Sequence, residues 1–266
     1  MKVKNFRNLA EVEIEPNPKL NLIFGPNGSG KTNFCEAINF LSEGDNLKGT
    51  HQAEMINWDS NYTLVKADLS SDDRVAVYVK EGEGKEIRIN SKQGRQSDLR
   101  SLVPIHTFVP EDLYISKGSP NRRRSLLNDH LSRLNPDYGS LIDQYNSELK
   151  KKNTLLKKDE INEEFLDVLG ERLAELGSRI MVKRVAHLSR LNEYLPEIYG
   201  RFVRNGGKLS LDYEEDGVEE MTQEEVFELL RKRLEENRGK ELERGTTVVG
   251  PHRDKFEYRL SDNSLR

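Results

Sequence analysis

The sequence predicts an α/β fold in which a sheet-rich lobe that carries a phosphate-binding loop is interrupted by a lobe of helices. Three observations lead to this prediction. The stretch GPNGSGKT, residues 25–32, lies between a short apolar run and an amphipathic segment. Apolar and polar residues alternate through much of the first hundred residues, which is typical of strands with one buried face. From Ser119 onward the apolar spacing becomes that of amphipathic helices.

The loop at residues 25–32 fits the pattern G-x-x-x-x-G-K-[ST]. Gly25, Gly28 and Gly30 allow the backbone to form a nest whose amide hydrogens converge on one anion. The helix that begins at the loop adds the positive end of its dipole. We expect Lys31 to bridge the β- and γ-phosphates of a nucleotide and the Thr32 hydroxyl to bind Mg²⁺.

The strands are predicted from apolar runs and alternation. Residues 20–24, LNLIF, form an apolar run before the loop and are interpreted as a short buried strand. Alternation predicts strands at 10–14 and 75–79, and a hairpin joins the second of these to a strand at 87–89 across the turn EGEGK. The apolar run at 103–109, VPIHTFV, predicts a further buried strand. We expect the strands at 10–14, 75–79 and 87–89 to form an antiparallel layer beside the strands that carry the loop.

The helices are predicted from caps and spacing. Ser119–Pro120 and Asn135–Pro136 each combine a capping residue with a first-turn proline. A long helix with leucines at helical spacing follows over about 165–195, and Thr222 with Glu225 forms a capping box that opens another. After Gly239 we expect strands again, at 245–250 and 256–260. The predicted domains are a head lobe at 1–112 and 241–266 and a helical arm at 113–240.

Composition narrows the function. No apolar run approaches the roughly 18 residues of a membrane span, and the amino terminus lacks the apolar core of a secretory signal. A single cysteine, Cys35, excludes an internal disulfide and suits a reducing cytoplasm. The five histidines show no metal-ligand spacing, so Mg²⁺ on the nucleotide is the metal we expect. The net charge of −4 does not decide whether nucleic acid is bound, since affinity depends on local basic patches.

Several polar clusters leave their role open. Arg7 and Asn8 end the first strand, where they either approach the nucleotide or form a solvated turn. The arginines at 122–124 occupy a first helical turn, where the dipole disfavours cations. We expect at least one to pair internally, through Glu111 or Asp112, with DNA phosphates as the alternative. The lysines at 150–152 are interpreted as the solvated turn of the arm, or else as DNA contacts. The residues considered for DNA contact are Arg122, Arg123, Arg124, Lys150, Lys151 and Lys152.

Two further stretches concern chemistry. Residues 250–254, GPHRD, form a polar turn between two predicted strands, and spacing alone assigns no chemistry to them. A hydrolytic phosphate-loop protein needs a carboxylate after an apolar strand to hold Mg²⁺ and orient water. No run of four apolar residues followed by Asp-Glu occurs here. We therefore expect no catalytic residue within these residues, and we expect the sequence to be cut at its carboxyl end.

Four stretches resemble the RecF family, the bacterial recombinational-repair ATPases related to SMC heads. These are KNFRNL, NLIFGPNGSGKTNFCEAINFLSEG, TFVPEDLYISKGSPNRRRSLLND and TVVGPHRDKFEYRL, in family order and spread over the whole chain. The last two are more specific than the loop, which many families share. The resemblance implies an ABC/SMC-like ATPase head interrupted by a helical arm. The family's signature loop and acidic magnesium strand should follow GPHRD and are absent from the sequence.

The resemblance also implies a function. Family members are expected to bind ATP and Mg²⁺, to hydrolyse ATP weakly, and to dimerise with nucleotide between the heads. They are expected to bind double-stranded DNA near single-strand gaps and to act with RecR and RecO in loading RecA, in the cytoplasm at the nucleoid. By position, the nucleotide would contact Gly25, Pro26, Asn27, Gly28, Ser29, Gly30, Lys31, Thr32, Asn33, Arg7 and Asn8. A magnesium-sensing glutamine is replaced here by Glu111 or Asp112.

Two alternatives belong to other classes of protein. A small-molecule kinase also uses this loop, with the helical lobe as a lid over an acceptor pocket. A nucleotide-dependent scaffold would hold a protein partner without hydrolysis. The long arm and the GPHRD stretch are not required by kinase chemistry, and the missing acidic strand favours the scaffold for these residues alone.

Overall fold

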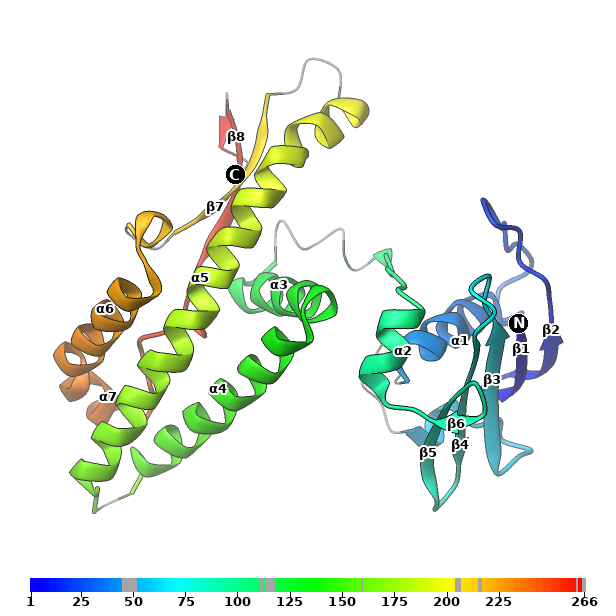
Figure 1. The fold of residues 1–266 in the computed structure, drawn as a ribbon, viewed down its shortest axis with the longest axis horizontal. Coiled ribbons are helices and arrows are strands. Elements are labelled where there is room, and N and C mark those ends of the chain that lie inside the picture. Colours follow the sequence, from blue (N-terminus) through cyan, green and yellow to red (C-terminus); the bar gives the residue numbers. More distant parts are fainter. Residues whose placement is uncertain are drawn as a thin grey trace. The chain divides into compact units, whose positions relative to one another are not determined.

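The computed structural model describes residues 1–44, 52–110, 112, 118–158, 160–203, 207–214, 217–261, 263 and 264. The chain divides into two compact units, Met1–Phe108 and Val109–Arg266, which are described separately (Figure 1). The predicted head and arm boundaries differ from this division, because they assign residues 241–266 to the lobe of the amino terminus. That assignment stays a prediction. No helix among the described residues is long and apolar enough to cross a membrane.

The first unit is a six-stranded antiparallel sheet in the order β2-β1-β3-β4-β5-β6. The register aligns one row of apolar side chains across it, since Val3 pairs with Val65, Val65 with Val77, and Val77 with Ile87. The elements are β1 (Lys2–Phe6), β2 (Leu9–Glu13), α1 (Lys31–Glu43), a short 3-10 helix (Gln52–Met55), β3 (Tyr62–Asp68), β4 (Arg74–Lys80), β5 (Gly84–Ile89), β6 (Lys92–Gln93) and α2 (Gln96–Leu102).

Helix α1 packs on the sheet and thereby fixes the position of the loop before it. Ala37, Phe40 and Leu41 are buried on its inner side, and the Phe40 ring lies 5.6 Å from the ring of Phe6. The predicted strands at 10–14 and 75–79 and the hairpin to 87–89 are confirmed by β2, β4 and β5. The alternation of apolar and polar residues therefore predicted these antiparallel strands correctly.

Two apolar runs were wrongly predicted as buried strands. Residues 20–24 form no strand, and the side chains of Leu22 and Phe24 are 78% and 91% exposed. Residues 103–109 form no strand either; they run along α1, where Ser42 donates to the Val103 carbonyl and Thr107 to Asn39. An apolar run indicates only that the side chains of a segment favour burial against other apolar groups. Strand formation also needs a neighbouring strand with free backbone groups, and none of the described strands pairs with these runs.

The second unit is built around one 40-residue helix, α5 (Glu163–Phe202), which crosses it from end to end (Figure 1). Helices α4 and α6 pack along α5, and a small sheet in the order β7-β8-β9 is antiparallel. The other elements are α3 (Pro120–Leu134), α4 (Pro136–Leu155), β7 (Leu209–Tyr213), a short 3-10 helix (Val218–Glu220), α6 (Gln223–Glu236), α7 (Arg238–Arg244), β8 (Phe256–Leu260) and β9 (Asn263–Ser264).

The helix starts follow the predicted caps. Ser119 and Asn135 precede α3 and α4, each with proline at the first helical position, and Thr222 with Glu225 forms the capping box of α6. The prediction of strands directly after Gly239 was wrong at 245–250, because α7 continues to Arg244 and an extended loop follows it. Strand β7 was missed inside the predicted helical lobe, although LSLDY alternates.

Two glycines on α5 differ in what surrounds them and give a matched test of packing. A Cβ at Gly170 would have no heavy atom within 4 Å, whereas one at Gly177 would lie 3.0 Å from Leu230 and 3.2 Å from Pro251. We expect Gly170→Ala to raise the free energy of unfolding by up to about 1 kcal/mol through helix propensity. We expect Gly177→Ala to gain less or to destabilise, because buried neighbours must move. Urea unfolding of both variants measures the difference, and equal gains would contradict it.

Candidate phosphate-binding site

The loop before α1 has the backbone of a phosphate nest. Gly25, Gly28 and Gly30 adopt positive φ angles of 155°, 80° and 92°. Gly30 caps α1 without a side chain, and the first turn of the helix contains no acidic residue. The amide groups at this helix end therefore present a positive field with no carboxylate beside it. This arrangement fits the phosphates of a nucleotide.

Lys31 and Thr32 stand at the start of α1. The Lys31 Nζ atom donates to the carbonyl oxygens of Gly25 and Pro26, at 2.9 and 2.7 Å. The ammonium group therefore lies across the loop, where an anion would compete with neutral carbonyls for it. The Thr32 side chain belongs to an exposed residue. Both are placed as the motif predicted; their contacts with nucleotide and Mg²⁺ stay predictions.

The turn between β1 and β2 holds the loop from the side. Phe6 pairs with Leu9, so Arg7 and Asn8 form a two-residue hairpin turn. Asn8 Nδ2 donates to the Gly28 carbonyl at 3.0 Å, and Asn33 Nδ2 donates to Asn8 Oδ1 at 2.8 Å. A Cβ at Gly30 would lie 2.7 Å from Leu9 and 2.9 Å from Asn8. Asn8 thus links the loop to α1, and only glycine fits at position 30.

Arg7 contacts α1 and not merely solvent. Its Nε atom lies 2.6 Å from Glu36 Oε2, and the Glu36 side chain is 4% exposed. The two atoms form an ion pair without the orientation of a hydrogen bond. The backbone of Arg7 is held as well, since its N–H donates to Met55 O and its carbonyl accepts from Asn57. Sequence reasoning missed Glu36, and no pattern distinguishes this carboxylate from an ordinary helix residue.

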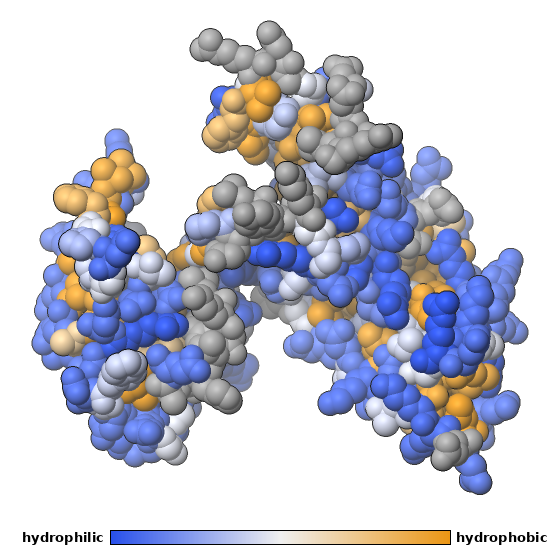
Figure 2. Space-filling view, turned by 180° about the vertical axis from the view of Figure 1, so that it is seen from behind, coloured by the Kyte–Doolittle hydropathy of each residue, from blue (hydrophilic) through white to orange (hydrophobic). Residues whose placement is uncertain are grey.

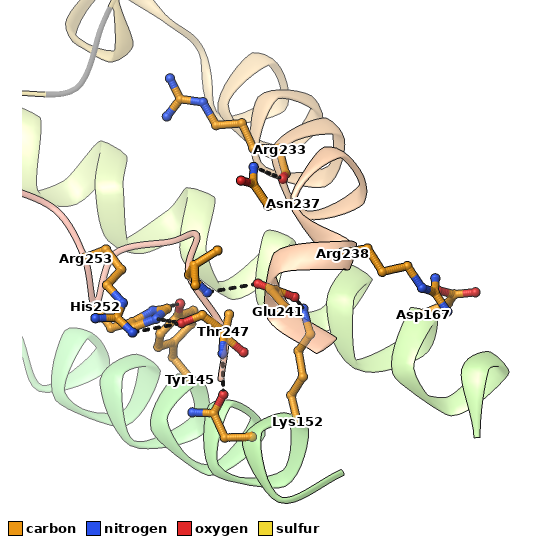
Figure 3. Close-up of polar contacts among 12 residues, drawn as sticks. Tyr145, Lys152, Asp167, Arg233, Asn237, Arg238, Glu241, Thr247, His252 and Arg253 are labelled. Carbon is orange, nitrogen blue, oxygen red and sulfur yellow. Dashed lines mark hydrogen bonds and ion pairs between the residues drawn. The ribbon is translucent and has the colours of Figure 1, made fainter. Parts of the chain in front are cut away.

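A second polar cluster surrounds residues 250–254 in the second unit (Figure 3). Tyr145 of α4 lies 2.8 Å from His252 Nδ1, and His252 Nε2 lies 3.2 Å from the Thr247 carbonyl. Because a carbonyl only accepts, Nε2 carries the proton and Nδ1 accepts from the tyrosine. A Cβ at Gly250 would lie 2.4 Å from the Tyr145 hydroxyl, so glycine is required there. The cluster fixes the loop in one conformation.

A buried arginine holds the same loop from α5. The Arg184 guanidinium, 2% exposed, donates to Asp254 Oδ2 at 2.6 Å and to the Pro251 carbonyl at 2.7 Å. It also donates to Asn128 of α3 and Tyr138 of α4. Asp254 accepts in addition from Tyr213 of β7. The GPHRD residues therefore serve as a structural junction of α3, α4, α5 and β7, a role that their spacing did not reveal.

Some basic residues considered for DNA contact are occupied internally. Arg124 donates to the carbonyl of Asp254 at 2.5 Å and to the Asn121 side chain. One arginine is therefore held internally, as expected, but its partners are Asp254 and Asn121 and not Asp112. Asp112 instead accepts from the Val109 N–H. Glu111 lies outside the described residues. The contacts of Arg122 and Arg123 with DNA stay predictions.

The lysines are not all part of a solvated turn, since α4 extends through them to Leu155. Lys152 pairs with Glu241 of α7 at 2.7 Å, and both side chains are almost fully buried (Figure 3). A DNA phosphate cannot reach it there, which corrects its place in the predicted set. Lys151 is exposed and pairs with Glu148, while Lys150 is exposed. The described residues contain no group of three or more metal-ligating side chains.

Comparison with known proteins defines the class of this head. The sequence model of the RecF/RecN/SMC N terminal domain family matches residues 1–245. The fold is thus that of ABC- and SMC-type ATPase heads with a helical arm, as the sequence predicted. The chain belongs to the RecF family of DNA replication and repair proteins.

Relatives and solved structures carry this assignment. The chain is 33% identical to the DNA replication and repair protein RecF of Clostridium acetobutylicum, over 98% of this chain and 73% of the relative. It is also 33% identical to RecF of Chlamydia caviae, over 100% and 72%. A solved structure of the recombination mediator protein RecF-ATPrS matches with a TM-score of 0.86 and 30% identity, over 100% of this chain and 74% of the other. One of RecF-ATP has a TM-score of 0.82 and 31% identity, over 99% and 74%.

The buried histidine makes stability depend on pH. Burial lowers the pKa of His252 from 6.5 to about 4. The unfolded chain takes up this proton near pH 6.5 and the folded chain near pH 4. Stability from this group is therefore complete above pH 6.5 and is lost as pH falls toward 4, to a total of about 3 kcal/mol.

Substitution of His252 by Gln should remove most of this dependence. We expect the variant to be less stable than the wild type at pH 7.5 and to lose less free energy of unfolding between pH 6.5 and 4.5. Urea unfolding at several pH values measures both quantities. His106→Gln, at an exposed position of the first unit, is the control, and a His252→Gln profile parallel to that of the wild type would contradict the prediction.

Proposed function

We propose that the chain binds ATP with Mg²⁺ at residues 25–32 and works as a nucleotide-controlled DNA-repair protein of the RecF type. The observation that carries the proposal is the loop itself, in which three glycines with positive φ precede a helix end that no side chain caps, beside Lys31. The related solved structures are described as RecF-ATP and RecF-ATPrS, which supports ATP as the nucleotide. Family membership favours this role over the small-molecule kinase and the scaffold.

Each residue of the loop has a role in this proposal. The backbone amides from Gly25 to Thr32 and the Lys31 ammonium would hold the phosphates, and the Thr32 hydroxyl would hold Mg²⁺. When bound, the metal supplies positive charge to the phosphates. Asn8 and Asn33 would keep the loop in shape through their mutual hydrogen bond and the bond to Gly28. Arg7, anchored by Glu36, would lie at the side of the nucleotide.

The proposed cycle uses ATP as a joint between two copies of the protein. A phosphate held at a helix end with exposed neighbours remains accessible to a second head, which would complete its coordination. The dimer would bind double-stranded DNA near single-strand gaps, largely without regard to sequence, because phosphate contacts carry no base information. RecR and RecO are the proposed partners, in loading RecA during recombinational repair. The proposed location is the cytoplasm, at the nucleoid, and the proposed hydrolysis is weak.

Replacement of the loop lysine tests the nucleotide site. Lys31→Met removes the ammonium group and its charge-assisted hydrogen bonds, each worth about 1.5–3 kcal/mol. We expect ATP affinity, measured by isothermal titration calorimetry with Mg²⁺, to fall roughly 10- to 100-fold, with an unchanged thermal unfolding midpoint. Lys19→Met, at an exposed position before the loop, is the control. Wild-type affinity in Lys31→Met would refute the assignment of this site.

A further inference from the structure

Several exposed basic side chains of the second unit pair with a neighbouring carboxylate. Arg172 pairs with Glu175 and Arg201 with Glu197 on α5, and similar pairs occur on α6. Intrahelical pairs of this kind leave little net charge on the surface. Figure 2 shows a mainly hydrophilic surface over this unit, with scattered apolar side chains. Other exposed lysines, such as Lys150, Lys208 and Lys255, form no ion pair with a described residue either, so a group of cations is distinguished by its arrangement in a row.

Three basic residues in the middle of α5 have no such partner. Arg179, Lys183 and Arg190 form no ion pair and no side-chain hydrogen bond with another described residue. Arg179 and Arg190 are exposed, and Lys183 is partly exposed. At about 100° per residue they lie within about 40° of one another around the helix axis. We call these three residues the α5 basic stripe.

The stripe borders the buried side of the helix. At about 100° per residue, buried Leu176 lies about 20° from Lys183 around the axis and buried Leu188 about 160° from the middle of the stripe, while Arg179 and Arg190 face solvent. The helix is rigid and keeps the three charges along about 16 Å of its length, at about 1.5 Å per residue. Of the two carboxylates beside the stripe, Glu175 pairs with Arg172, and Glu193 is exposed and forms no ion pair with a described residue. The local charge is therefore positive in a chain whose net charge is −4.

We propose that the α5 basic stripe contacts the phosphate backbone of double-stranded DNA, which rests on the DNA-binding role proposed above. Duplex DNA presents one charge per about 1.7 Å of its axis, so a straight row of cations meets several phosphates without reading bases. The stripe replaces Lys152 among the proposed DNA contacts, because Lys152 is buried against Glu241. An acidic peptide lacks this regular charge density. An anionic membrane surface is the competing ligand, and a vesicle-binding assay tests for it.

The test compares two triple variants that remove the same charge. Arg179→Ala/Lys183→Ala/Arg190→Ala removes the stripe. The control, Arg231→Ala/Lys232→Ala/Lys240→Ala, removes three exposed cations of α6 and α7 that contact Glu228, Glu236 and Asn237. Binding to a fluorescent 30-base-pair duplex is measured by anisotropy from 50 to 200 mM KCl, with ATP and Mg²⁺. Circular dichroism and ATP titration confirm that each variant is folded and that the loop works.

The stripe variant should show a plot of log K against log salt that is flatter by about 2.7, at about 0.9 per lost phosphate contact. Over a fourfold rise in salt its affinity should then fall about 40-fold less than that of the wild type. The control variant should keep the wild-type slope. Equal slopes in the wild type and the stripe variant would overturn the inference while leaving DNA binding intact.

Two further outcomes separate this inference from the proposed function. If the wild type binds ATP but no duplex, DNA binding and the stripe contact both fail, whereas the nucleotide site stands. Vesicles with 30% phosphatidylglycerol are tested in parallel. If the stripe variant loses vesicle binding and keeps the wild-type DNA slope, the stripe is a membrane contact and the inference is wrong.

Discussion

The second unit depends on the burial of one charged side chain, Arg184. A guanidinium removed from water is tolerated only when its donors are satisfied and its charge is balanced. Here Asp254 balances the charge, and the acceptors come from Pro251, Asn128 and Tyr138. These groups lie on segments far apart in sequence, so one arginine on α5 determines where α3, α4 and the loop at 250–254 must stand. Any other packing that moved one of these acceptors away would leave a buried guanidinium N–H without a hydrogen bond, which costs free energy and so disfavours that packing.

In the first unit, too, a few specific contacts position a functional segment. The phosphate loop has little regular structure of its own and is positioned by the hairpin turn of β1 and β2 and by α1. Asn8 bonds to both sides, and the missing side chain of Gly30 lets the turn approach. Arg7, through Glu36, fastens the turn to the helix. The loop is thus held by residues outside it, and its own glycines leave the space in front of the backbone amides open for an anion.

Local signals in the sequence predicted much of this architecture, and nonlocal ones did not. Caps at Ser119, Asn135 and Thr222 act within a few residues, so they located the starts of α3, α4 and α6. The runs at 20–24 and 103–109 were misread because a strand depends on partners elsewhere in the chain. The glycine motif correctly located the start of α1 at Lys31, directly after the loop. The burial of Lys152 against α7 and of Glu36 against the β1–β2 turn depends on contacts between distant segments, which no spacing in the sequence records.

The length of α5 has a mechanical consequence. Forty residues in one helix span about 60 Å. Up to Pro196, which has no N–H to donate, each turn is bonded to the next, and α4 and α6 pack along its sides, so this part of the helix resists bending. From Glu163 it spans about 50 Å, and a tilt of about 5° at one end would displace the other by about 4 Å. Small rearrangements at the base of such a rod become large movements at its tip.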